Sequence, residues 1–118
     1  MIQIDYHDRR PIYEQILSGF RKLILTGIMQ PEEQLPSVRS LAMELSTNPN
    51  TVQKAYQELE RQGFIYTIKG RGNFVQNVSG LRKERVEEIL RQMEKLLSEA
   101  EELGERREDL LQQLRGLT

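Results

Sequence analysis

Residues 35–75 contain two short helical patterns followed by a glycine-rich ribbon, and this order restricts the fold more than any other part of the chain. Ser37 can cap the first helix, while Asn48 and Pro49 can cap and begin the second. The apolar residues recur at helical spacing, as Val38, Leu41, Ala42 and Leu45 and then as Val52, Ala55, Tyr56 and Leu59. Two short helices joined by a polar turn predict a helix-turn-helix.

A β hairpin is predicted directly after the second helix. Gly63 ends the helix, and residues 64–68 carry aromatic and β-branched side chains typical of a strand. Gly70, Arg71 and Gly72 suit a tight tip, and residues 73–76 form the returning strand. A helix-turn-helix with such a hairpin, or wing, is an architecture that reads DNA. The predicted fold is therefore mainly α with a small β-wing, a winged helix-turn-helix over residues 1–78.

The residues before this motif predict one more helix and a short arm. Pro11 opens a helix that runs to about residue 26 and ends before Gly27. Its apolar stripe is expected to pack in the core and consists of Ile12, Ile16, Phe20, Leu23 and Ile24. Residues 1–10 are interpreted as a polar arm in which Ile2, Ile4 and Tyr6 alternate as a possible edge strand. Residues 28–34 are predicted to form a loop.

Residues 79–118 are predicted to form two helices separated at Gly104, because glycine suits the end of a helix better than its interior. Forty residues are too few for a second core, so their apolar stripe meets either the winged domain or a second copy of itself. Dimerisation is preferred, since a two-fold partner covers an apolar patch with its own copy. The residues predicted to dimerise are Ile89, Met93, Leu96, Leu97, Ala100 and Leu103.

Composition argues against several classes of protein. The chain of 118 residues has no cysteine and one histidine, His7, which is interpreted as a solvated residue of the arm. No nucleophile–base pair or metal cluster is recognisable, so neither an enzyme nor a cofactor is predicted. No apolar run is long enough to span a membrane, and a cytoplasmic location is expected. The net charge is −1. Since the acidic excess lies in residues 79–118, it argues only weakly against DNA binding.

Many residues between Arg10 and Gln76 recur at the fixed spacing of a known family. They are Pro11-Ile12-Tyr13-Glu14-Gln15-Ile16, Leu35-Pro36-Ser37, Arg39, Leu41-Ala42, Asn50-Thr51-Val52, Ala55-Tyr56, Leu59-Glu60, Gly63-Phe64-Ile65, Gly70, Gly72 and Phe74-Val75. On these residues the chain resembles the GntR family of bacterial transcriptional regulators. The short tail, with Ala100 and Leu103-Gly104, resembles the YtrA-like branch. One departure is Glu32, where the family usually has glycine.

The resemblance and the helix faces together suggest the DNA contacts. Arg39 resembles a family arginine that contacts DNA, and its planar fork suits guanine; a surface salt bridge to Glu44 or Glu32 is the alternative. The wing tip resembles one that enters the minor groove, with an ordinary hairpin turn as the alternative. Tyr56 is assigned to the core, although its hydroxyl could reach a phosphate. The predicted DNA-binding residues are Arg39, Asn48, Asn50, Thr51, Gln53, Lys54, Lys69, Gly70, Arg71 and Gly72.

Within this set, Asn50 and Gln53 suit adenine, Asn48 and Thr51 suit phosphates, and Lys54 suits neutralisation of one phosphate. Asn48 could equally serve only as a helix cap. The expected function is a repressor that binds double-stranded DNA as a homodimer on a palindromic operator. An interaction module or an RNA-binding winged helix are the alternatives. No small-molecule effector is identified, and the tail leaves hardly any room for a pocket of the usual size, roughly 300 Å³ or more.

Overall fold

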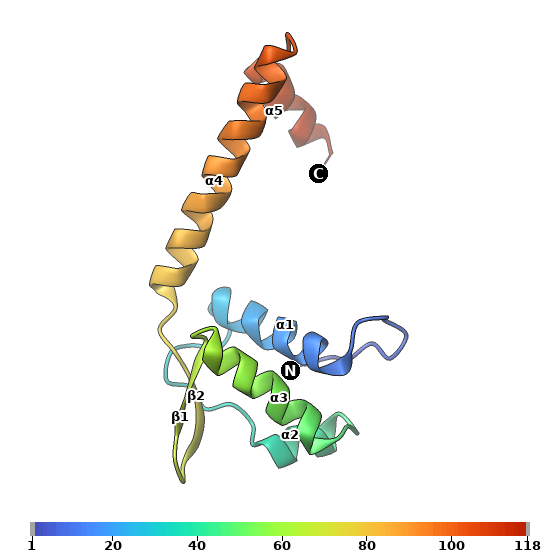
Figure 1. Ribbon diagram of the computed structural model, residues 1–118, viewed down its shortest axis with the longest axis vertical. Coiled ribbons are helices and arrows are strands. Elements are labelled where there is room, and N and C mark those ends of the chain that lie inside the picture. Colours follow the sequence, from blue (N-terminus) through green and yellow to red (C-terminus); the bar gives the residue numbers. More distant parts are fainter. Residues whose placement is uncertain (1, 118) are drawn as a thin grey trace. The chain divides into compact units, whose positions relative to one another are not determined.

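Helices dominate the computed structural model, which describes residues 2–117, and one small antiparallel sheet completes it (Figure 1). The chain divides into two compact units, Met1–Gly80 and Leu81–Thr118. This confirms the predicted class, mainly α with a β-wing. The elements are α1 (Ile12–Leu25), α2 (Val38–Glu44), α3 (Pro49–Arg61), β1 (Ile65–Ile68), β2 (Gly72–Val75), α4 (Ser79–Glu102) and α5 (Arg107–Gly116).

The helix-turn-helix begins each of its helices with the cap that the sequence predicts. The Ser37 hydroxyl accepts a hydrogen bond from the Ser40 N–H at 3.1 Å, at the start of α2. The Asn48 side-chain oxygen accepts one from the Asn50 N–H at 2.8 Å, and Pro49 is the first residue of α3. Each cap satisfies a backbone donor that has no partner inside the helix. Both boundaries are therefore set by local sequence.

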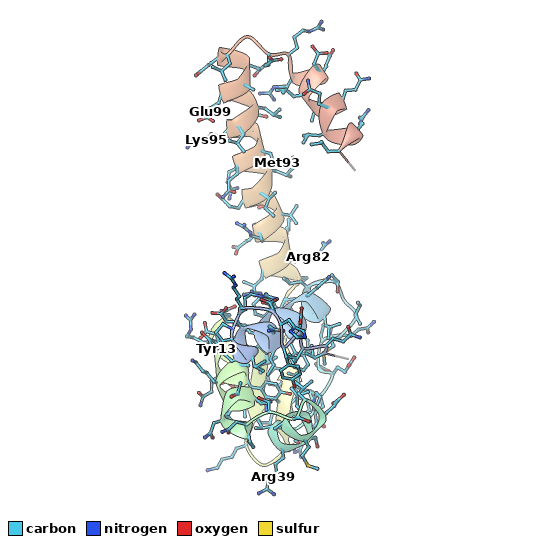
Figure 2. All side chains as sticks on the ribbon, turned by 90° about the vertical axis from the view of Figure 1, so that its right-hand side faces the viewer. Tyr13, Arg39, Arg82, Met93, Lys95 and Glu99 are labelled. Carbon is cyan, nitrogen blue, oxygen red and sulfur yellow. The ribbon has the colours of Figure 1, made fainter. Side chains whose placement is uncertain are left out.

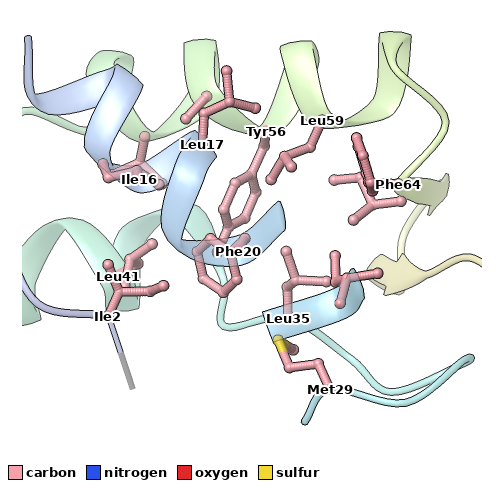
Figure 3. Close-up of a cluster of buried hydrophobic side chains, with 14 of the residues drawn as sticks. Ile2, Ile16, Leu17, Phe20, Met29, Leu35, Leu41, Tyr56, Leu59 and Phe64 are labelled. Atoms are coloured by element: carbon pink, nitrogen blue, oxygen red, sulfur yellow. The ribbon is translucent and has the colours of Figure 1, made fainter. Parts of the chain in front are cut away.

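The core of the first unit lies between α1, α2 and α3 (Figure 3). The Phe20 and Tyr56 rings meet edge to face at its centre, with ring centroids 5.7 Å apart. Burial of each Leu-sized side chain contributes about 1.5–3 kcal/mol, so this cluster stabilises the unit. The fully or largely buried residues include Ile16, Phe20, Ile24, Leu41, Ala42, Leu45, Val52, Ala55, Tyr56 and Leu59, as the helical periodicity predicts.

The N-terminal segment is part of this core, and the prediction of an edge strand there is wrong. Residues 2–10 contain no strand, and Ile2 is buried against the core. The side chain of Gln15, itself buried in α1, accepts from the Asp5 N–H at 2.9 Å. It also donates to the carbonyl oxygens of Asp5 at 3.0 Å and Arg10 at 3.1 Å. A side chain of α1 thus satisfies backbone groups that an edge strand would pair with a neighbouring strand.

Replacement of Gln15 by leucine is expected to lower the free energy of unfolding by roughly 1–2 kcal/mol, because three hydrogen bonds to backbone groups are lost. The change should also accelerate amide hydrogen exchange at Asp5. Chemical denaturation and exchange measured by nuclear magnetic resonance test both effects. Gln3→Leu is the control, since Gln3 is exposed. Unchanged exchange at Asp5 in Gln15→Leu would contradict this role of Gln15.

The loop before α2 runs along the free edge of β2, which the sequence did not indicate. The Glu32 N–H donates to the Val75 carbonyl at 2.7 Å, the Val75 N–H donates to the Glu33 carbonyl at 2.9 Å, and the Leu35 N–H donates to the Asn73 carbonyl at 2.9 Å. Glu32 has a φ of +72°, a left-handed conformation that favours glycine. The turn expected of a family glycine is therefore made here by glutamate.

Candidate nucleic-acid interface

The outward face of α3 carries the polar residues predicted to contact DNA. Asn50, Gln53 and Lys54 are exposed, and Thr51 is half-buried. The opposite face is buried through Val52, Ala55, Tyr56 and Leu59. A helix that is anchored on one side and polar on the other presents its first two turns to a groove in a fixed orientation. Asn50 and Gln53 have amide groups that can pair with an adenine edge.

Asn48 and Tyr56 both have hydrogen-bonding roles within the protein. Asn48 caps α3, as described above, and its side chain remains exposed beside the helix start. The Tyr56 hydroxyl donates to the Pro36 carbonyl at 2.7 Å. Burial, with a smaller contribution from the Glu44 carboxylate, raises the pKa of Tyr56 above its ordinary value, so the hydroxyl keeps its proton. The assignment of Tyr56 to the core is confirmed, and its hydroxyl already donates within the protein.

Arg39 lies in the first turn of α2 and is exposed. Neither Glu44 nor Glu32 forms an ion pair with it, and no other residue in the described part of the chain does so. In Figure 2 its guanidinium points away from the body of the first unit. The alternative of a surface salt bridge is therefore not observed, and the planar fork is available for an external partner.

The hairpin tip lies at the same end of the first unit as Arg39 (Figures 1 and 2). Strands β1 and β2 pair in the register Tyr66 with Phe74 and Ile68 with Gly72. The three residues between them are Lys69, Gly70 and Arg71, and Gly70 has a φ of +80°. Lys69 and Arg71 are exposed and form no ion pair with any residue from 2 to 117. Three cationic side chains without ion pairs therefore gather at one end of the unit.

Lys54 is folded back over α1 rather than extended from α3. Its Nζ atom lies 3.8 Å from the centroid of the Tyr13 ring, which is a cation–π contact. Between α1 and α3 there is a hollow of about 660 Å³ to which both residues contribute. Hydrogen bonds from Arg61, then Gln62, lower the pKa of Glu58 in this hollow to about 2, so it stays ionised beside Arg61. The hollow thus carries both positive and negative side chains. In this structure, the Lys54 ammonium lies against the Tyr13 ring.

Sequence reasoning missed Gln34, which reaches the wing from the loop before α2. Its Nε2 donates to the Arg71 carbonyl at 2.9 Å, across 37 positions of sequence. Gln34 and Phe74 also form an isolated β-bridge. A glutamine in a polar loop carries no local signal of such a contact, because its partner is distant in the chain.

The second unit contains α4 from Leu81 onward and α5, separated by a turn in which Gly104 has a φ of +94°, as predicted. Arg107 joins the two helices: it donates to both carboxylate oxygens of Glu94 at 2.7 Å and to Glu101 at 3.0 Å. Hydrogen bonds from Arg107 lower the pKa of Glu94, so this carboxylate stays ionised. These contacts tie the first residue of α5 to α4.

An apolar groove of about 450 Å³ lies between α4 and α5. The expectation that the tail leaves hardly any room for a pocket is therefore wrong, because the return of α5 forms an open groove that one helix alone cannot. Among the residues predicted to dimerise, Met93, Leu96, Leu97 and Ala100 line the groove, whereas Ile89 and Leu103 do not. Ile89, Met93, Leu96 and Leu103 are 40–84% exposed. From α5 the lining residues are Leu110, Leu111, Gln113, Leu114 and Leu117.

Residues 2–117 contain no cluster of histidine, cysteine or acidic side chains that could hold a metal ion. No helix in the same range combines the length and apolarity needed to cross a membrane. Every buried side-chain nitrogen or oxygen atom among these residues has a hydrogen-bond partner.

Comparison with known proteins gives a match at family level. Residues 12–75 match the gntR family of bacterial regulatory proteins. The chain is 56% identical over 75 residues to the HTH-type transcriptional repressor YtrA of Bacillus subtilis. That alignment covers 64% of this chain and 58% of the repressor, so the chain spans less than two thirds of this relative. The resemblance to the YtrA-like branch is confirmed.

Solved structures extend the match to the tail. A transcriptional regulator from Oenococcus oeni shares 30% identity at a TM-score of 0.71, covering 99% of this chain and 98% of that one. The DNA-binding domain of AraR in complex with operator ORE1 shares 25% identity at a TM-score of 0.54. This second match covers 64% of the chain and 92% of the AraR domain.

Proposed function

The chain belongs to the gntR family of bacterial regulatory proteins, and on that basis we propose that it is a transcriptional repressor that binds a palindromic operator as a homodimer. The protein acts in the cytoplasm, where its DNA is located. It is a regulator rather than an enzyme, as its relatives are. A relative that is named as a repressor supports repression over activation.

The observation that carries this proposal is the gathering of Arg39, Lys69 and Arg71, without ion pairs, at one end of the first unit. Phosphates attract such cations because binding releases counterions from DNA, and base edges offer them hydrogen-bond acceptors. In the proposed complex, the start of α3 enters the major groove with Asn50 and Gln53 on adenines and Arg39 on a guanine. Asn48, Thr51 and Lys54 contact phosphates, and residues 69–72 enter the minor groove.

Two copies meet through the apolar stripe of the tail in this proposal. The exposed apolar residues of α4 and the groove beside α5 support it, since a two-fold partner buries both. Two winged units then place their α3 helices in successive major grooves, about 34 Å apart. Occupation of a promoter by this dimer excludes polymerase and represses transcription.

The logarithm of the affinity for operator DNA is expected to fall linearly with the logarithm of the salt concentration. The slope is about −0.9 for each phosphate that the protein neutralises. The operator is obtained by selecting bound duplexes from a random pool, which also reveals its symmetry. Fluorescence anisotropy at several salt concentrations then gives the slope, with single-stranded RNA as competitor. A pool without any enriched sequence, or preferential binding of RNA, would reject the proposal.

A further inference from the structure

We propose that Gln34 is a positioning residue that holds the wing tip in the conformation in which Arg71 contacts DNA. The inference rests on the proposed function, because it takes the wing to be a DNA contact. Gln34 itself need not touch DNA; its amide acts on the backbone that carries Arg71.

The first support is the contact of Gln34 with the tip. Its Nε2 donates to the Arg71 carbonyl at 2.9 Å. Within the hairpin, the tip is closed by the hydrogen bond from the Arg71 N–H to the Ile68 carbonyl, also 2.9 Å. Arg71 is thus held on both sides of its Cα, by its N–H and by its carbonyl. Loss of the Gln34 amide frees the carbonyl side and with it the direction of the Arg71 side chain.

The second support is the fit between Gln34 and Gly72. Gly72 has a φ of +127°, and a Cβ atom built on it would lie 2.7 Å from Nε2 of Gln34. The amide therefore occupies the space that any other side chain at position 72 would fill. Gly72 leaves room for the Gln34 side chain, and that side chain donates to the carbonyl of Arg71, the residue before Gly72. The two features together make the contact specific.

The third support is the position of Gln34 between the wing and α2. A two-stranded hairpin is only marginally stable by itself, and here the segment of residues 32–35 is the second partner of β2, beside β1. Ser37, the cap of α2, follows three residues after Gln34, and Arg39 lies in the first turn of α2. The same short segment thus connects the two groups proposed to read the major and minor grooves.

The test compares the salt dependence of operator binding between variants of the full chain. Gln34→Met fills similar space without a donor and leaves the charge unchanged. It is expected to weaken binding about five-fold, the worth of one hydrogen bond, and to lower the salt slope by about 0.9, as loss of one ionic contact does. Arg71→Ala should give the same slope, and the double variant should bind no more weakly than Arg71→Ala alone. Gln30→Ala, an exposed glutamine of the same loop, is the control.

Each alternative has its own result. A weaker Gln34→Met complex with an unchanged salt slope means that Gln34 contacts DNA directly, which overturns a positioning role. Additive losses in the double variant, or a Gln34→Met that behaves like Gln30→Ala, overturn it as well. An Arg71→Ala variant that binds as well as the unmodified protein rejects the wing contact in the proposed function instead. Circular dichroism confirms that every variant is folded.

Discussion

The double variant Met93→Glu and Leu97→Glu is expected to be monomeric and to bind the full operator about 10²–10⁴-fold more weakly than the unmodified protein. Both side chains line the groove between α4 and α5. Glutamates there place like charges across a two-fold interface and remove apolar area that would otherwise be buried. The affinity falls because each winged unit then binds its half-site without the effective concentration that the partner provides.

Light scattering gives the oligomeric state, and anisotropy on full and half operators gives the affinities. Lys95→Glu is the matched control: it changes the net charge by the same two units, and Lys95 projects from a different side of α4 than Met93 does (Figure 2). The control should remain dimeric. A chain ending at Gly80 should be a folded monomer that binds half-sites weakly, because residues up to Gly80 form a compact unit. A monomeric unmodified protein, or a truncated one that dimerises, would reject dimerisation through the tail.

The variant Arg39→Ala is expected to lose roughly 1–3 kcal/mol of binding free energy on the operator, about 5–150-fold in affinity, together with the preference at one base pair per half-site. Arg39 is exposed and has no ion pair among the described residues, so the loss does not come from a broken contact inside the protein. Its guanidinium can donate two hydrogen bonds to one guanine edge, which an alanine cannot replace.

The variant Lys54→Ala distinguishes a phosphate contact from the base contact proposed for Arg39. It should weaken binding to all sequences alike and lower the salt slope by about one, because a phosphate contact carries no sequence information. Titrations on the operator, on single-base variants and on unrelated duplex measure both effects. If Arg39→Ala weakened specific and nonspecific complexes equally, its assignment to a base would be wrong.

The helices and the hairpin could be predicted because their causes are local. Ser37 and Asn48 cap the helices that follow them, Gly63 and Gly104 end helices, and apolar residues at every third or fourth position mark the buried faces. Each of these signals acts within about one turn, so it is visible in consecutive residues. The exposed face of α3 follows from the same periodicity, since the residues left over from the buried face include Asn50, Gln53 and Lys54.

The candidate DNA contacts could be chosen from residue type and helix face. The side chains that surround them in the folded protein could not be predicted. Nothing near Lys54 in the sequence indicates that its ammonium lies over Tyr13, 41 positions earlier. The edge strand predicted from Ile2, Ile4 and Tyr6 failed for a related reason. Alternation is a local pattern, whereas the hydrogen-bond partner of that segment is the buried Gln15 of α1.

By itself the sequence determined the order and approximate limits of the helices and the hairpin, the winged helix-turn-helix and the family, because capping, periodicity and motif spacing are properties of neighbouring residues. Tertiary structure alone decided which distant side chains meet: Gln34 with the Arg71 carbonyl, Gln15 with the N-terminal segment, and Arg107 with Glu94 and Glu101. These contacts form only when packing of the core and the return of α5 bring separate segments within hydrogen-bond distance. A hydrogen bond depends on that distance and direction, and neither is encoded in the residues that flank its donor.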